Sequence, residues 1–440
     1  MNGDIIFEPL HFRNLTVKNR IMRSNMSGRF DNYDGSGTQA RINWEEKFAR
    51  GGVGAILSAH VPVAIRGRIF PNYATIDRDE RIPFWRKLAE KVHEYDCKLI
   101  MQLSHAGRQQ DMPGIENLGK KAQSSTSRSE PVHGFECQAM TREEIKKTIR
   151  LFAEGARRAR EAGLDGVETH SAHGYLITQF LSSGINDRED EYGGSLENRA
   201  RFLLEIIRAI RGEVGDDFHV QAKINGTDHN DAVFPWRKRG DRLREAIQVA
   251  KWLEEAGVDA IHVSTGSFYP HPINPTGGFP LDVMGRAYAA MLSSGKRTFT
   301  NYLMMRYKIT RPFLRFLWER TKGDVLEGIV ADEAGEIKQQ VNVPVLCTGG
   351  FQHAPYIRKI IDEGYCDGVS IARSLIANND LVKIFAQGKD VPDKPCTYCN
   401  RCLFGLMDSP LACYDLSRYD GDYDRMMREA MSVFEPSGFE

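Results

Sequence analysis

The chain lacks a net charge, because its 59 Lys and Arg residues equal its 59 Asp and Glu residues. Nucleic acids and anionic membranes select strongly basic proteins, so this balance argues against either as the main partner. No apolar run approaches the roughly 18 residues that a membrane-spanning helix needs. Residues 1–12 lack the basic start and apolar stretch of a signal peptide, so we expect a cytoplasmic protein with reduced cysteines.

A composition of 41% hydrophobic and 27% charged residues is typical of a globular protein with a large core. A similar seven-residue segment occurs three times, as EAGLDGV (161–167), EAGVDAI (255–261) and EGYCDGV (363–369). Each one ends a helical pattern at Gly and enters an apolar run, which indicates a helix followed by a buried parallel strand. The repetition predicts a βα architecture.

Eight strand-like segments alternate with helical patterns along the chain. They are 21–26, 53–59, 98–104, 166–172, 219–225, 260–266, 344–350 and 368–373. Between two of them, Thr141 and Glu144 fit a capping box that starts a helix over 141–163. Eight such units favour an α/β fold with a closed (β/α)8 TIM barrel. A doubly wound open sheet is the alternative, but no GxGxxG follows the first strand.

The domain organisation has two irregular parts. We expect a barrel over residues 1–390 and a cysteine-rich extension over 391–440. Residues 267–335 form an unusually long insert between strands six and seven. From Gly285 to Gly323 the insert carries nine Lys and Arg residues against one acid, and it is rich in aromatics. It is interpreted as a lid or dimer element, with an acidic-substrate site or a membrane contact as alternatives.

Polar side chains follow the apolar strands where a barrel carries its active site. They include Gln102 and His105, then His170, His173 and Tyr175, then Lys223 and Arg373. His170 and His173 are compatible with ordinary hydrogen-bonding histidines or a metal pair, but the HExxH motif of zinc proteases is absent. Because this pair ends a strand, we expect both rings to face a pocket.

Four stretches of sequence resemble the Old Yellow Enzyme family of flavin-dependent reductases. They are residues 7–26, MQLSHAGR (101–108), the run HSAHGYLITQFLSSGINDREDEYGGSLENR (170–199), and CTGGFQ with SIARSLIANNDL (347–352 and 370–381). The resemblance implies FMN bound noncovalently over the barrel mouth. The residues implied for FMN are Ser24, Asn25, Met26, Ser27, Ala59, Gln102, Lys223, Gly349, Gly350, Ala372 and Arg373.

The physical chemistry of these residues agrees with that implication. The loops after strands seven and eight are the usual phosphate site of a barrel, and Gly349, Gly350 and Arg373 lie there. A cation at Lys223 suits an anionic reduced flavin. The sequence departs from the common family pattern at Asn25, at Ser27, at Lys223 in place of Arg, and at Ala372 in place of Gly.

The resemblance also implies a reaction. NADH or NADPH would reduce FMN, and hydride would then pass to the β-carbon of an α,β-unsaturated carbonyl compound or enoyl thioester. His170 and His173 would hold the carbonyl oxygen, and Tyr175 would protonate the α-carbon. Alternatives are an amine (N-demethylating) dehydrogenase, a flavin electron-transfer module and a metal-dependent barrel hydrolase. The partners expected are small molecules or a separate reductase, with a homo-oligomer possible.

The stretch 396–413 holds Cys396, Cys399, Cys402 and Cys413, spaced C-x2-C-x2-C-x10-C. Such spacing is compatible with an iron–sulfur cluster, with zinc, or with buried free thiols. One branch of the family carries a comparable run after the last barrel strand, and there it binds a [4Fe–4S] cluster. The resemblance therefore favours a cluster at these four cysteines. That branch continues into a dinucleotide-binding domain, which we do not expect in a chain of 440 residues.

Overall fold

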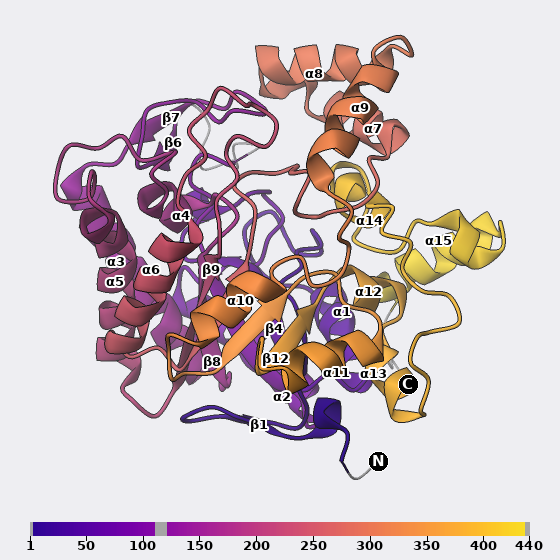
Figure 1. Ribbon diagram of the computed structural model, residues 1–440, viewed down its shortest axis with the longest axis horizontal. Coiled ribbons are helices and arrows are strands. Elements are labelled where there is room, and N and C mark those ends of the chain that lie inside the picture. The colour runs from indigo at the N-terminus through magenta and orange to yellow at the C-terminus, as the bar shows by residue number, and fades with distance from the viewer. Residues whose placement is uncertain (1–2, 111–120, 436–440) are drawn as a thin grey trace.

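Eight parallel strands close into a barrel in a computed structural model that describes residues 3–110 and 121–435 (Figure 1). The order around the barrel is β10-β11-β12-β3-β4-β5-β8-β9. The strands are β3 (Ile21–Arg23), β4 (Ala55–Pro62), β5 (Lys98–Ser104), β8 (Gly166–Ser171), β9 (His219–Asn225), β10 (Ala260–Ser264), β11 (Val345–Thr348) and β12 (Gly368–Ile371). Each overlaps a segment predicted as a strand, although β4 runs on to Pro62, beyond the predicted end at residue 59. The barrel prediction is therefore confirmed and the open sheet is excluded.

Helices surround the barrel as an outer layer. They are α1 (Gln39–Arg50), α2 (Ile82–His93), α3 (Arg142–Glu161), α5 (Leu196–Val214), α6 (Leu243–Glu255), α10 (Ala331–Lys338), α11 (Ala354–Asp362), α12 (Arg373–Ala377) and α13 (Leu381–Ala386). The start of α3 shows how local sequence signals determine where a helix begins. Glu144 N donates to Thr141 Oγ1 at 3.2 Å, and Thr141 N donates to Glu144 Oε2 at 2.8 Å, which confirms the predicted capping box.

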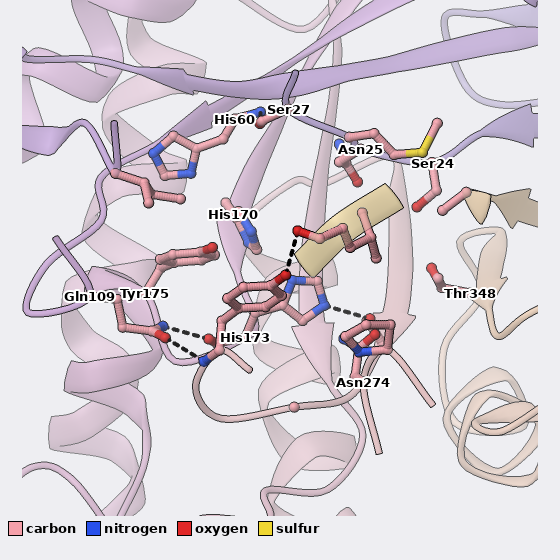
Figure 2. Close-up of a pocket in the computed structure, with 18 of the residues that line it drawn as sticks. Ser24, Asn25, Ser27, His60, Gln109, His170, His173, Tyr175, Asn274 and Thr348 are labelled. Carbon is pink, nitrogen blue, oxygen red and sulfur yellow. Dashed lines mark hydrogen bonds between the residues drawn. The ribbon is translucent and has the colours of Figure 1, made fainter. Parts of the chain in front are cut away.

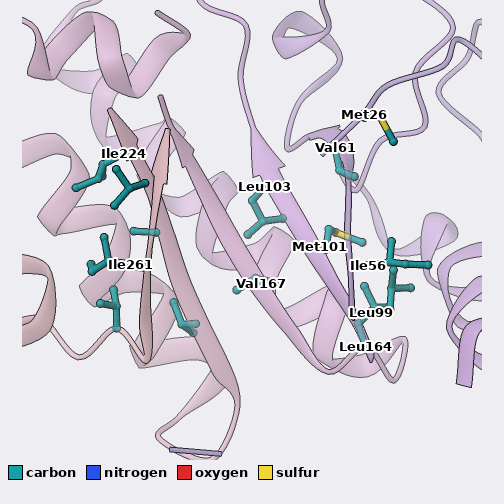
Figure 3. Packing of buried hydrophobic residues seen from close by; sticks show 14 of the residues in the cluster. Met26, Ile56, Val61, Leu99, Met101, Leu103, Leu164, Val167, Ile224 and Ile261 are labelled. Atoms are coloured by element: carbon teal, nitrogen blue, oxygen red, sulfur yellow. The ribbon is translucent and has the colours of Figure 1, made fainter. Parts of the chain in front are cut away.

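Side chains alternate along each strand between the helices and the barrel interior. In β5, Leu99, Met101 and Leu103 join the large core between strands and helices (Figure 3). Ile100 points the other way, into a small cluster with residues of the N-terminal hairpin. That hairpin, β1 (Leu10–His11) with β2 (Thr16–Val17), lies at the amino-terminal end of the barrel and closes it. A ligand-binding site is therefore expected at the carboxyl-terminal end of the barrel.

The connection between β10 and β11 forms a small helical unit of its own. It contains α7 (Leu281–Ala290), α8 (Lys296–Arg306) and α9 (Arg311–Lys322), which stand beyond the barrel in Figure 1. Its core includes Met284, Tyr288 and Trp318, and it also takes in Phe135 and Phe404 from outside the connection. The unit thus joins a loop after β5 to the C-terminal segment. The following helix, α10, packs against β11 and α6 as part of the outer layer.

The remaining elements are short. Helix α4 (Leu176–Leu181) follows β8, and β6 (Ala122–Ser124) pairs with β7 (Cys137–Ala139). The C-terminal segment contains α14 (Arg401–Phe404) and α15 (Tyr423–Met431), and it returns to the barrel where Asn43 Nδ2 donates to Val433 O at 3.0 Å. Among the described residues, no helix combines the length and apolar character needed to cross a bilayer.

Candidate functional site

A cavity opens at the carboxyl ends of the barrel strands, and its empty space, open mouth included, is ≈ 1570 Å³ (Figure 2). The structure brings together here nearly all the residues predicted to bind cofactor or substrate. They are Ser24, Asn25, Met26, Ser27, Gln102, His170, His173, Tyr175, Lys223, Gly349, Gly350, Ala372 and Arg373.

Ala59 and His105 lie outside the lining of this cavity. Ala59 is buried in β4, and its neighbour His60 lines the cavity instead. The pairing of β4 with β5 shifts register between Leu57 and His60, so the alternation that strand geometry predicts is broken there. His105 is buried, and its Nδ1 accepts a hydrogen bond from Gly107 N at 3.1 Å. We therefore assign His105 a structural role.

The segment after β3 forms one wall of the cavity and is tied to its neighbours on both sides. Ser24 N donates to Ile371 O at 2.9 Å, and Asn25 Nδ2 donates to Ser58 O at 3.1 Å. His60 N donates to Ser27 Oγ at 3.0 Å. These bonds fix an irregular backbone in place, so its polar groups are preorganised for a ligand.

Lys223 of β9 places a buried cation under the cavity. Its Nζ donates to Asn25 Oδ1 at 2.8 Å and to Ser24 Oγ at 3.5 Å. Burial lowers the pKa of Lys223 to about 8, although Glu168 raises it. The side chain is therefore still charged at neutral pH, and an anionic group above it would compensate its desolvation.

A polar layer inside the barrel supports this cation. Glu168 accepts hydrogen bonds from Gln102 Nε2 at 2.9 Å and from Gln221 Nε2 at 2.6 Å, and it lies 2.7 Å from His262 Nδ1. Burial raises the pKa of Glu168, but His262, Lys223 and Gln221 together lower it to about 2. Glu168 is thus an anion at neutral pH, and Gln102 is already held by it.

At the far end of the cavity lie Gly349, Gly350 and Arg373. A Cβ at Gly350 would come 2.0 Å from Leu326 O, and its φ of +74° favours glycine as well. Arg373 Nη1 donates to Asn400 Oδ1 at 2.5 Å and to Thr276 O, and its guanidinium lies over the Tyr398 ring. Arg373 is therefore held between the cavity and the C-terminal segment.

His170 and His173 meet at the centre of the cavity with ring centroids 5.0 Å apart (Figure 2). His173 has a left-handed backbone, with φ +62°, and is fixed from three sides. Its N donates to Asn225 Oδ1 at 3.2 Å, its O accepts from Gln109 Nε2 at 2.7 Å, and its Nε2 lies 2.7 Å from Ser264 Oγ. A strained residue held this firmly indicates a functional constraint.

Both histidines are neutral at physiological pH. Burial lowers the pKa of His170 well below its usual value, and His173 lowers it further. Burial lowers the pKa of His173 in the same way, followed by the charge of Lys223. Each ring therefore has one N–H to donate and one nitrogen that accepts. Within the described part of the chain, the buried Nδ1 of His170 has no hydrogen-bond partner.

Tyr175 lies beside this pair, with its ring centroid 4.7 Å from that of His170. His60 packs against both rings, with centroid separations of 5.2 Å to Tyr175 and 6.0 Å to His170. The ring nitrogens of His60 face Ser104 Oγ at 2.8 Å and Gly67 O at 3.2 Å, so Nε2 donates and Nδ1 accepts. His60 is thus a fixed wall of the site. Sequence reasoning missed it because only the bulge in β4 turns it inward.

An aromatic and apolar wall completes the outer part of the cavity. Tyr269 joins two parts of it, because its hydroxyl donates to Leu403 O at 2.7 Å. The wall consists of Ile69, Phe70, Tyr73, Phe135, Phe268, Tyr269, Ile273, Leu403, Leu406 and Met407. These residues come from loops, the insert and the C-terminal segment, and no motif in the sequence marks them. The arrangement suits a planar apolar body above the two histidines.

The four cysteines of 396–413 line a second, smaller chamber whose empty space is ≈ 290 Å³. Arg373 and Arg418 line it as well, so Arg373 borders both the cavity and the chamber. Tyr398 N donates to Cys396 Sγ at 3.4 Å, and Arg418 Nη1 donates to Cys413 Sγ at 3.2 Å. Burial raises the pKa of the Cys396, Cys402 and Cys413 thiols, whereas the Tyr398 N–H and Arg373 at Cys396, and Arg418 at Cys413, act in the opposite direction.

The chamber does not have the geometry of a mononuclear metal site. Among the described residues, no set of three or more His, Cys, Asp or Glu side chains is arranged to hold one metal ion. Zinc requires four sulfurs at about 2.3 Å from a single point, so the structure gives zinc no support. All eight cysteines are free thiols in the structure.

Comparison with known proteins identifies the family of this chain. The sequence profile of the NADH:flavin oxidoreductase / NADH oxidase family matches residues 5–284. The chain belongs to this family. The match confirms the resemblance to the Old Yellow Enzyme family drawn from the motifs.

Individual members show how far the similarity extends. The NADH oxidase of Thermoanaerobacter brockii is 34% identical over 399 residues, which is 90% of this chain but 52% of that protein. A solved 2-naphthoyl-CoA reductase in complex with 2-naphthoyl-CoA superposes with a TM-score of 0.75 at 25% identity, over 96% of this chain and 58% of its own. The chain thus spans little more than half the length of either.

A shorter neighbour shows the shared fold. The Old Yellow Enzyme homologue of Zymomonas mobilis superposes with a TM-score of 0.65 at 21% identity, over 92% of this chain and 98% of its own. The shared fold therefore extends over nearly the whole of that protein. The fold prediction is supported independently of the sequence motifs.

The cavity fits FMN. Lys223 and Arg373 bring two cations to its floor and its far end, which suits a ring system that becomes anionic on reduction and a phosphate tail. Thr276 Oγ1 and His170 Nδ1 are buried cavity atoms that have no partner among the described residues. A bound ligand with hydrogen-bonding groups would satisfy them.

Proposed function

We propose that the protein is an FMN-dependent ene-reductase that reduces the C=C bond of α,β-unsaturated carbonyl compounds or enoyl thioesters with electrons from NADH or NADPH. The observation that carries this proposal is the neutral His170–His173 pair, which lies beside Tyr175 in a cavity that fits FMN. Two neutral donors with a phenol beside them suit a carbonyl group and a carbon that must be protonated.

The residues that would hold FMN come from five strand ends. Ser24, Asn25, Met26 and Ser27 follow β3, Gln102 lies in β5 and Lys223 lies in β9. Gly349, Gly350, Ala372 and Arg373 would hold the phosphate. When bound, FMN supplies hydride transfer between the nicotinamide donor and the alkene. Ala59 would support this wall from behind His60 rather than touch the ligand.

His170 and His173 would bind the carbonyl oxygen of the substrate. Neutral imidazoles donate hydrogen bonds without delivering a full positive charge to the site, and both pKa values lie well below neutral pH. Donors fixed in advance stabilise the negative charge that develops on the oxygen, because they need not reorganise during the reaction. His173 satisfies this requirement through the bonds to its backbone and to Ser264.

Tyr175 would deliver a proton to the α-carbon. Its ring packs against both His170 and His60, and Figure 2 shows it beside the histidine pair in the cavity. A phenol with a pKa near 10 is acidic enough for the carbon of an enolate. The presence of Tyr175 beside His170 and His173 argues against a protein that only transfers electrons, because electron transfer requires no proton donor.

The four-cysteine chamber would hold a [4Fe–4S] cluster. A cubane takes one thiolate per iron and therefore spreads its four ligands around a larger volume than zinc does. Cys396, Cys399, Cys402 and Cys413 line one chamber, with N–H donors directed at two of the sulfurs. Electrons for FMN would come from NAD(P)H or from a separate reductase through this cluster.

A spectrum and a substrate screen test the proposal. Purified protein should be yellow, with flavin absorption near roughly 375 and 450 nm. After anaerobic reduction by NADH or NADPH, an enone or an enoyl thioester should reoxidise the flavin. If methylated amines reduced the oxidised enzyme and no activated alkene reoxidised it, the amine dehydrogenase function would replace the one proposed here.

A further inference from the structure

Four arginines from separate segments gather around the loops at the rim of the cavity, and none of the four lines the cavity itself. Arg108 follows β5, Arg128 follows β6, Arg237 lies in the connection between β9 and α6, and Arg297 lies in the first turn of α8. Arg108 Nη1 donates to Arg128 O at 3.2 Å, which joins the first two. Arg108 ends the MQLSHAGR stretch, but none of the four belongs to the predicted site.

Arg297 is joined to the cavity through the loop that carries His133 and Phe135. Both of these residues line the cavity, and Gly134 lies between them. A Cβ at Gly134 would come 2.8 Å from Arg297 Cβ, so the arginine stem packs directly on this loop. Asn301 Nδ2 also donates to Val132 O at 2.9 Å, which fixes α8 against the same loop.

Arg237 approaches the cavity from the other side. Its guanidinium lies over the Phe234 ring at 5.5 Å from the centroid, and Phe234 contacts Phe268, which lines the cavity, at 6.5 Å. Burial lowers the pKa of Arg237, and the charges of Arg128 and Arg297 lower it further, whereas Glu130 raises it. The three guanidiniums are therefore within electrostatic range of one another.

The rim has more positive charge than its carboxylates balance. Arg128 pairs with Asp187 at 2.9 Å, and buried Glu130 interacts with Arg108. In the part of the chain that the structure describes, these two carboxylates face four guanidiniums. The amino end of α8, an eleven-residue helix that starts at Lys296, adds further positive potential. Like charges held together without a partner are destabilising, and a bound anion would relieve them.

We propose that Arg237 and Arg297, backed by Arg128, form a subsite for the anionic end of the molecule whose reactive end lies at His170 and His173. The group recognised is a carboxylate or a phosphate, which the guanidinium fork binds with two parallel hydrogen bonds. The aromatic wall between the two places would hold the planar body of that molecule. This inference rests on the proposed function. The anion belongs either to the unsaturated substrate or to the pyrophosphate of the nicotinamide donor.

The test compares one substrate with and without its charge. A planar enone with a distal carboxylate and its methyl ester are assayed with the wild type, with Arg237→Gln/Arg297→Gln and with Arg150→Gln, an exposed arginine of α3. Loss of two charged hydrogen bonds should raise the KM of the carboxylate by about 10- to 100-fold and leave that of the ester unchanged. Arg237→Lys should keep part of the binding because it keeps the charge.

A second arm measures reduction of the bound flavin by NADH and by NADPH in rapid mixing. A weaker donor affinity in the double variant, with no change in the carboxylate-to-ester ratio, would assign the subsite to the pyrophosphate. Unchanged values in both arms would overturn the proposal, provided that flavin content and melting temperature match the wild type. If wild-type enzyme reduced no enone, the proposed function would fail; calorimetric titration with the same carboxylate and ester would then still decide the subsite.

Discussion

The Nε2 atom of His173 lies 2.7 Å from the hydroxyl oxygen of Ser264, so a hydrogen bond joins the segment just after β8 to the end of β10 across the mouth of the barrel. Figure 2 shows His173 turned toward the centre of the cavity, with Gln109 holding its carbonyl from the other side. The side chain of His173 is thus positioned by β10, which is separated from β8 by β9 in the barrel. This relationship leads to the first prediction.

Ser264→Ala should disorder the His173 ring without removing it. We expect kcat/KM for an enone to fall by about tenfold, since a misplaced donor stabilises the developing oxyanion less well. Reduction of the flavin by NAD(P)H should be nearly unchanged. Thr265→Ser, at the adjacent residue of the cavity lining, is the matched control. Equal loss in both variants would indicate a general disturbance of the loop.

Tyr175→Phe should separate the two half-reactions. It removes the proposed proton donor but keeps the ring that packs on His170 and His60. We expect reoxidation of the flavin by an enone to slow by about 10²- to 10⁴-fold, the usual contribution of a general acid, while reduction by NAD(P)H stays fast. Rapid-mixing absorbance of the flavin measures both. Fast reoxidation in the variant would show that another group supplies the proton.

The buried neutral histidines should make the fold sensitive to acid. Burial lowers the pKa of His60 to about 4, although its bond to Gly67 O opposes this, whereas in the unfolded chain a histidine titrates near 6.5. Between these values the unfolded state binds a proton that the folded state does not. Stability is therefore fully present above pH 6.5 and falls as the pH drops toward 4, by up to about 3 kcal/mol for this residue.

Urea unfolding followed by circular dichroism at pH 7.0 and pH 4.5 measures this effect. His60→Gln keeps a polar group near Gly67 O and Ser104 but cannot titrate. We expect a lower stability at pH 7 and a smaller loss between the two pH values than in the wild type. His93→Gln, on the surface of α2 at the Asp165 contact, is the comparison because its side chain is 36% exposed. An unchanged pH slope in His60→Gln would contradict the assignment.

Removal of one cysteine should remove the cluster. Protein purified without oxygen should contain about four irons per chain and a broad shoulder near roughly 400 nm that dithionite bleaches. Cys413→Ser should lose most of the iron, and Cys137→Ser, a buried cysteine of β7, should keep it. One zinc per chain with no iron would transfer the chamber to zinc despite its geometry. Metal analysis and the absorption spectrum decide between these results.

Gly350→Ala should damage both the fold and FMN binding. Its Cβ would lie 2.0 Å from Leu326 O, and the left-handed backbone adds strain. We expect a loss of more than about 3 kcal/mol or a displaced loop with little bound FMN. Gly388→Ala has a similar φ of +83° but open space around it, so it should cost only about 1 kcal/mol and keep the flavin. Thermal melting and flavin content distinguish the two.

Much of the barrel was predictable, because each of its units carries its own local signals. Apolar strands, glycine at helix ends and the Thr141–Glu144 capping box are properties of neighbouring residues, and eight such units close in one way. His170, His173 and Tyr175 were predictable for a similar reason. A strand end is a local feature, and the carboxyl ends of parallel strands meet at one end of a barrel.

What the sequence determined by itself was therefore the barrel, the position of its active end and the polar residues that its strands carry there. Only the tertiary structure showed that a bulge turns His60 inward in place of Ala59. It also showed that Arg373 lies between the cavity and the cysteine chamber. The gathering of arginines from four segments around the rim of the cavity likewise became visible only there. These relationships join residues far apart in the chain. They depend on how loops and the insert pack on the barrel, and long-range packing leaves no periodic mark in the sequence.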